Sequence, residues 1–85
     1  MTKDQLVAKF KEMRKAGKAC RRQSAMGHLF GILFNEEIGA SGFNAARISR
    51  EAGLRDGDDG GIRDGQNLAK YVDVNDENRR RFGGG

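Results

Sequence analysis

The chain has 85 residues, with 16 Lys or Arg against 12 Asp or Glu, and its single cysteine is Cys20. A chain this short forms one small domain, and one cysteine excludes both an internal disulfide and a multi-cysteine zinc site. The longest apolar run, Leu29 to Phe34, is far shorter than a membrane span, and no apolar signal segment follows the N-terminus. We therefore expect one domain over residues 1–82, a glycine tail over residues 83–85, no membrane association and a cytoplasmic location.

The positive charge lies mainly in the first third of the chain. Residues 1–30 hold eight Lys or Arg and two acids, whereas residues 31–65 hold four Lys or Arg and seven acids. A basic surface separated in this way favours a polyanionic partner or an acidic protein surface. Solvated charges that keep a small domain soluble explain the same pattern equally well, so charge alone leaves both interpretations open.

The first expected element is an amphipathic helix from Lys3 to Ala16. Thr2 and Gln5 have the spacing of a capping box, and apolar residues follow at helical spacing. Gly17 is placed where a glycine ends a helix, although one longer helix that tolerates this glycine is the alternative. Four cations share one flank of this helix if the helical turn continues to residue 18: Lys11, Arg14, Lys15 and Lys18.

The stretch from Cys20 to Ile38 has the longest and most apolar helical pattern, and we expect it to be the most buried helix, ending at Gly39. Gly27 and Gly31 lie four residues apart, which lets the backbone of a neighbouring segment approach closely. His28 lies on the polar side without another ligand at a suitable spacing. The pattern therefore predicts neither a metal site nor a catalytic base there.

A short third helix is expected after Ser41 or Asn44, either of which can cap it, and Gly53 is expected to end it. The stretch from Ile48 to Leu54 resembles the first helix and turn of helix-turn-helix DNA-binding domains. In that family an apolar residue, a small residue, an apolar residue, a turn glycine and a further apolar residue recur in this order. The resemblance implies a small helical domain that binds DNA.

The chain departs from that family directly afterwards, where a recognition helix would begin. Arg55 to Gly61 is rich in glycine and aspartate, and such an acidic loop repels phosphates. The loop also fits several positions of a calcium-binding EF-hand, but Asn67 stands where the bidentate glutamate is needed. It lacks the preceding strand and the ending of a phosphate-binding loop as well. We expect no metal and no cofactor.

The segment from Ile62 to Val74 is ambiguous between helix and strand. We expect a short helix from Asp64 or Gly65 to Lys70, then an extended piece that pairs with Ile62 in a short β ribbon. Residues 75–78 have the composition of a turn or a new helix cap, and residues 79–82 form a basic end that should fray. The expected fold is mainly α, with three or four helices and at most this one ribbon.

No catalytic constellation is present, so we expect a protein that is not an enzyme. The leading hypothesis is a small nucleic-acid-binding module, such as a regulator, with DNA favoured over RNA. The alternative is a protein-interaction module or homodimer that uses the apolar central helix, with Met26, Phe43 and Phe82 as anchors. The candidate nucleic-acid contacts are Lys11, Arg14, Lys15, Lys18, Arg21, Arg22, Arg47, Arg50 and Arg63.

Overall fold

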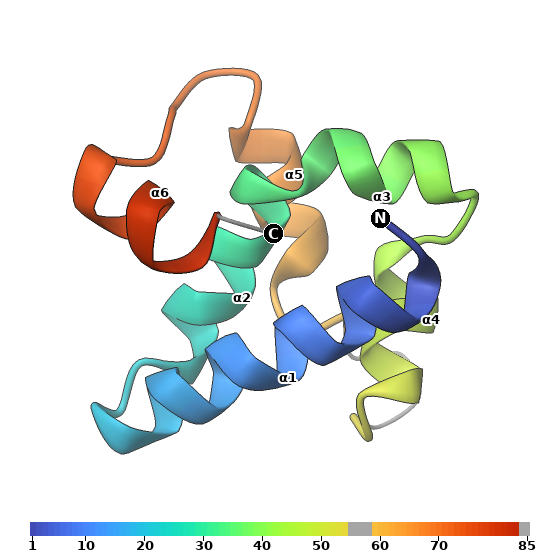
Figure 1. The fold of residues 1–85 in the computed structure, drawn as a ribbon, viewed down its shortest axis with the longest axis horizontal. Helices are drawn as coiled ribbons and strands as arrows, with labels where there is room; N and C mark the ends of the chain where they lie inside the picture. The colour runs from blue at the N-terminus through green and yellow to red at the C-terminus, as the bar shows by residue number, and fades with distance from the viewer. Residues whose placement is uncertain (55–58, 84–85) are drawn as a thin grey trace.

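The computed structural model describes residues 1–54 and 59–83, and the helices in these two ranges confirm the expected mainly α fold. In chain order they are α1 Lys3–Ala19, α2 Gln23–Leu33, α3 Asn35–Ser41, α4 Ala45–Glu51, α5 Ile62–Leu68 and α6 Asp76–Phe82 (Figure 1). These six helices exceed the three or four expected, and no strand occurs within the described ranges. None of the helices in those ranges is long and apolar enough to cross a membrane.

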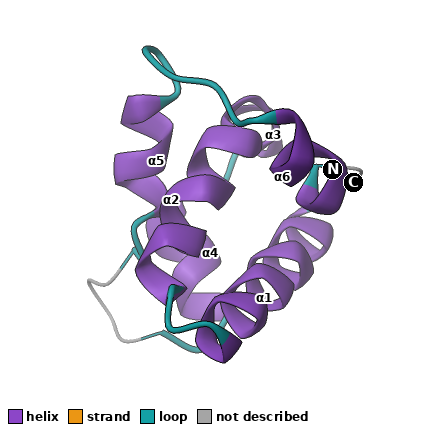
Figure 2. Ribbon diagram, turned by 90° about the vertical axis from the view of Figure 1, so that its left-hand side faces the viewer, coloured by secondary structure: helices purple, strands orange, loops and turns teal. Residues whose placement is uncertain are grey.

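The core is centred on α2, which lies between α1 and α5 and packs against both (Figure 2). The ring centroid of Phe30 in α2 is 5.1 Å from that of Phe10 in α1 and 5.1 Å from that of Phe34. Aromatic pairs at this spacing stabilise a core beyond the area that they bury. Further fully buried side chains come from α1, α3, α4 and α5: Leu6, Met13, Ile38, Ile48 and Ile62.

α1 begins as expected, because Thr2 and Gln5 form both hydrogen bonds of the capping box. The expected end at Gly17 is wrong, since the helix continues to Ala19. Arg21, with φ of 59°, takes the left-handed conformation that ends α1. Gly17 serves a packing role instead, because a Cβ there would lie 2.9 Å from the carbonyl oxygen of Arg22.

The helix expected from Cys20 to Ile38 is divided in two. Phe34, with φ of −112° and ψ of 19°, separates α2 from α3, and this bend turns both Phe34 and Ile38 into the core. A straight helix would have carried part of its apolar arc away from the core. α3 runs through Gly39, the expected end, and stops where Gly42 takes a φ of 79°.

The predicted close approach at Gly27 and Gly31 is confirmed. A Cβ at Gly27 would overlap the carbonyl oxygen of Gly60, and a Cβ at Gly31 would overlap that of Ile62. Gly65 makes the reverse contact, since a Cβ there would overlap the carbonyl oxygen of His28. α5 therefore packs on α2 with the two backbones in direct contact.

The C-terminal third differs most from expectation. α5 begins at Ile62, which is fully buried and helical. The expected β ribbon is therefore wrong, because Ile62 cannot pair as a strand and residues 71–74 form no strand either. Residues 76–82 form α6, whose first turn is capped by Asn75, the side chain of which accepts a hydrogen bond from the N–H of Asn78. The expected fraying of this basic end is wrong, because Phe82 is 4% exposed and joins the core.

The anchors expected for a protein partner on the central helix are engaged within the fold. Phe82 is buried, and Met26 is partly buried against the core. The ring of Phe43 lies under two cations, with its centroid 5.4 Å from Lys3 Nζ and 5.0 Å from Arg47 Cζ. None of the three belongs to the exposed large hydrophobic side chains of the described residues.

Candidate nucleic-acid interface

The junction between α1 and α2 gathers positive charge through its backbone geometry. The N–H of Arg21 donates to the carbonyl of Lys18 at 3.2 Å, and the N–H of Arg22 donates to the carbonyl of Gly17 at 2.6 Å. This pair of hydrogen bonds is a Schellman motif with an arginine at the position that usually holds glycine. The left-handed conformation costs a residue with a Cβ about 1–2 kcal/mol. The turn brings Lys18, the last cation of α1, beside Arg21 and Arg22 in the linker between α1 and α2, residues 20–22.

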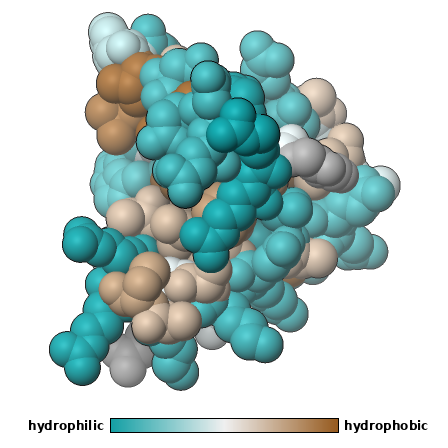
Figure 3. Space-filling model, turned by 60° about the vertical axis from the view of Figure 1, so that its left-hand side comes forward, coloured by the Kyte–Doolittle hydropathy of each residue, from teal (hydrophilic) through white to brown (hydrophobic). Residues whose placement is uncertain are grey.

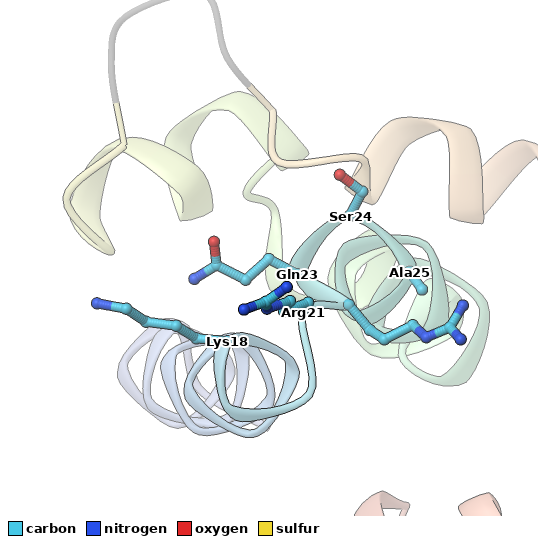
Figure 4. Close-up of a pocket in the computed structure, with 6 residues that line it drawn as sticks. Lys18, Arg21, Gln23, Ser24 and Ala25 are labelled. Atoms are coloured by element: carbon cyan, nitrogen blue, oxygen red, sulfur yellow. The ribbon is translucent and has the colours of Figure 1, made fainter.

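A first cleft opens at this junction, with a volume of about 580 Å³. Figure 4 shows the side chains of Lys18, Arg21 and Gln23 gathered on one side of it, while Ser24 points towards the segment that precedes α5. In the described part of the chain, no Asp or Glu lines this cleft. The residues that line it are Lys18, Arg21, Arg22, Gln23, Ser24 and Ala25.

A second cleft, of about 260 Å³, adjoins the first, because Gln23 and Ser24 line both. Its other lining residues are Arg14, His28, Gly60 and Gly61. We call the two clefts together the basic groove, and its polar residues are Arg14, Lys18, Arg21, Arg22, Gln23, Ser24 and His28.

His28 is held at the far end of the basic groove by two neighbours. Its Nδ1 donates to the carbonyl oxygen of Ser24 at 2.7 Å, one turn earlier in α2. Its Nε2 lies 3.6 Å from Asp64 Oδ2 of α5, which is an acid bordering this end of the groove. The arrangement fixes the imidazole between α2 and α5, and it makes the α1–α2 end of the groove the more positive one.

Lys11 and Lys15 extend the basic surface along α1 without lining the groove. Both are exposed, and their spacing from Lys18 places them on the same flank of the helix. Lys11 lies seven residues before Lys18, which corresponds to about 10 Å along the axis. A long polyanion in the groove can therefore reach them.

Arg47, Arg50 and Arg63 are not brought into the groove. Arg47 and Arg50 belong to α4, which lies near the N-terminal end of α1 (Figure 1), and Arg47 Nε is 3.5 Å from Glu51 Oε2. The first cleft lies at the other end of α1, and neither Arg47 nor Arg50 lines either cleft. Arg63 Nε, in α5, is 3.8 Å from Asp59 Oδ2, which offsets part of its charge.

The turn that resembles a helix-turn-helix has the predicted geometry. Gly53 has φ of 95°, its N–H donates to the carbonyl of Arg50, and the N–H of Leu54 donates to the carbonyl of Ser49, both at 3.0 Å. These bonds form the expected Schellman cap of α4. Most of the following acidic loop lies outside the described residues. This part includes Asp56 and Asp58, which fit positions of a calcium-binding EF-hand loop. Within residues 1–54 and 59–83, no group of three or more His, Cys, Asp or Glu is placed to hold a metal ion.

Gln23, Ser24 and His28 were missed as groove residues by the sequence analysis. Gln23 and Ser24 directly follow the Arg21–Arg22 pair, and His28 lies four residues after Ser24 on the same face of α2. These polar residues continue the basic run, and that continuation could have indicated from the sequence that they line the groove. The contribution of residues 60 and 61 depends on the packing of α5 against α2, so no local pattern indicates it.

A family model described as an HTH-like domain matches residues 2–75. The matched range contains α1 to α5 and the whole basic groove, and it ends before α6. No curated protein and no solved structure matches the chain.

Proposed function

The chain belongs to the HTH-like domain family, and we propose that it is a nucleic-acid-binding module whose basic groove contacts the phosphate backbone. The observation that carries the proposal is the convergence of four cations from α1 and the linker on one groove: Arg14, Lys18, Arg21 and Arg22. Phosphate contacts supply most of the sequence-independent affinity of such proteins and fix their orientation on the nucleic acid.

Duplex DNA is the proposed ligand, because helix-turn-helix domains bind duplex DNA in its major groove and contact the flanking phosphates. In this chain the cations that could hold phosphates lie on α1 and the linker. α5 is less suitable, because it carries Asp64 and its Arg63 lies beside Asp59. We therefore assign backbone positioning to the basic groove, with Lys11 and Lys15 as outer contacts. Arg47, Arg50 and Arg63 are peripheral, since they lie outside the groove.

The test is the salt dependence of binding to a labelled DNA duplex, followed by fluorescence anisotropy. The unmodified protein should lose affinity steeply as salt rises, because each phosphate contact releases condensed counterions. Arg22→Glu should weaken binding and reduce the log–log slope by roughly 0.9 for the contact removed.

Arg80→Glu is the matched control, because Arg80 is also exposed but lies in α6, away from the groove. It should change the slope less than Arg22→Glu does. Failure of the unmodified protein to bind duplex at low salt, where electrostatic attraction is strongest, would contradict the proposal. Equal losses in the two variants would show instead that net charge matters and the groove does not.

A further inference from the structure

Three exposed apolar or aromatic side chains lie at the end of α5 and directly after it. Leu68, Tyr71 and Val72 are 42%, 83% and 47% exposed, and we call these three side chains the apolar knob. Figure 3 shows a small group of hydrophobic residues near the top of a mainly hydrophilic face. The N–H groups of Tyr71 and Val72 donate to the carbonyl of Leu68 at 2.8 and 3.0 Å, so the knob has a defined turn conformation. Exposed apolar groups with a polar surround mark interaction surfaces.

A pocket of about 280 Å³ lies directly beside the apolar knob, since Ala69 and Asp73 from the same segment line it. Asp73 accepts a hydrogen bond from Arg79, which leaves Glu36 and Glu37 as the other charged groups of the lining. We call this the acidic pocket, and the residues that line it are Ile32, Leu33, Asn35, Glu36, Glu37, Ala69, Asp73 and Arg79.

We propose that a second copy of this chain docks here, with the apolar knob of each copy in the acidic pocket of the other. A convex and a concave element that adjoin on one face can pair reciprocally about a two-fold axis, as an isologous dimer requires. The charges agree with this pairing, because the exposed Lys70 lies within the knob segment and Glu36 and Glu37 line the pocket. The lining of the pocket is mainly polar, with Ile32 and Leu33 as its larger apolar side chains, so the docking rests chiefly on these charge pairs.

The dimer should be weak and should leave the basic groove open. Three apolar side chains from each copy bury less than the roughly 1,200 Å² of a stable interface, so association is expected only at high protein concentration. Ile32 and Leu33 end α2, whereas Gln23 and Ser24 of the basic groove begin it, about 14 Å away along the helix. Two copies could therefore each present a free groove.

Sedimentation velocity over a concentration series, without nucleic acid, tests the proposal independently of the proposed function. The unmodified protein should show a rising average mass, and Tyr71→Ala should remain monomeric. Lys70→Glu alone and the pair Glu36→Lys with Glu37→Lys should each remain monomeric, because like charges then face each other. An equal mixture of these two variants should associate again, since both reciprocal contacts become favourable.

Lys18→Glu is the matched control: it also reverses an exposed lysine, but in the basic groove, and it should associate like the unmodified protein. Circular dichroism should show that every variant keeps its helices. The proposal is overturned if the unmodified protein stays monomeric up to about 1 mM, the range in which weak complexes form. It is overturned equally if the mixed charge variants fail to associate, or if Tyr71→Ala associates normally.

Discussion

Arg21 combines a strained backbone with a position in the basic groove. Its φ of 59° suits glycine, so Arg21→Gly should raise the free energy of unfolding, by about 1 kcal/mol at most once the greater chain entropy of glycine is counted. The same substitution removes a guanidinium from the groove and should weaken DNA binding. Urea unfolding followed by circular dichroism and anisotropy titration would measure the two effects.

Arg22→Gly is the control, because Arg22 has φ of −131°, outside the left-handed region. It removes the same charge without relieving strain, so it should weaken binding and gain no stability. If Arg21→Gly stabilises the fold and binds DNA as well as the parent does, the strained arginine has no functional role and the groove is placed incorrectly.

Glu51 links the N-terminus of α1 to α4. Its carboxylate lies 2.8 Å from Lys3 Nζ and 3.5 Å from Arg47 Nε. The hydrogen bond from Lys3 is the main cause that holds the pKa of Glu51 below its ordinary value of 4.5. A carboxyl group with a lowered pKa stabilises the fold above its unfolded-state pKa, and this contribution disappears as the pH falls through the lower folded-state pKa.

Glu51→Gln should therefore lower the unfolding midpoint at neutral pH and have a smaller effect well below pH 4.5. Thermal unfolding of both proteins across this range would give the difference. The lost stability should be modest, because the ion pairs lie at the surface. A difference that stays constant with pH would show that the carboxylate charge does not stabilise the contact between α1 and α4.

At the scale of elements, the glycines of α2 decide how closely α5 can pack. Gly31→Ala should lower the free energy of unfolding by at least ~1–3 kcal/mol, because the added Cβ would overlap the Ile62 carbonyl. Gly39→Ala is the matched substitution in α3, where a Cβ would meet no atom within 4 Å. That variant should be neutral or more stable, by up to about 1 kcal/mol. Equal unfolding midpoints would contradict the backbone contact between α2 and α5.

Local signals predicted the capped ends of helices better than the ends that no local cap fixes. Thr2 and Asn44 cap their helices as expected, because a side-chain cap needs only neighbouring residues. The ends of α1 and α2 depend instead on packing contacts with the segment that follows each helix. Gly17 looks like a stop but fills a close contact with the linker, and Phe34 interrupts α2 so that its ring enters the core. These choices are made by tertiary packing, which short patterns do not contain.

The groove was predicted in part for the same reason. Lys18, Arg21 and Arg22 are near one another in sequence, so their convergence follows from a single turn. Arg14 joins them through the helical repeat. Arg63 is distant in the sequence, and only the packing of α5 on α2 shows that it lies outside the groove and beside Asp59.

At the scale of the whole molecule, the aromatic side chains and the basic groove are separated. The chain has five Phe and one Tyr, all within the described residues, and none of them lines the groove. Phe10 lies 5.7 Å from the guanidinium of Arg14 but is fully buried, and Tyr71 belongs to the apolar knob. Proteins that hold single strands use exposed aromatic rings on which bases stack, at ~1–3 kcal/mol per base. The groove offers positive charge without such a stacking surface.

The protein should therefore bind duplex DNA more tightly than a single strand of the same length and sequence. A duplex presents phosphates at higher linear density, one charge per about 1.7 Å of axis, which favours a ligand-binding surface made of cations alone. Competition of unlabelled duplex and single strand against a labelled duplex, at one fixed salt concentration, measures the preference. Tyr71→Ala serves as the internal check, because removing the exposed ring should leave single-strand binding unchanged. Tighter binding of the single strand, lost in Tyr71→Ala, would move the nucleic-acid site from the basic groove to the segment after α5.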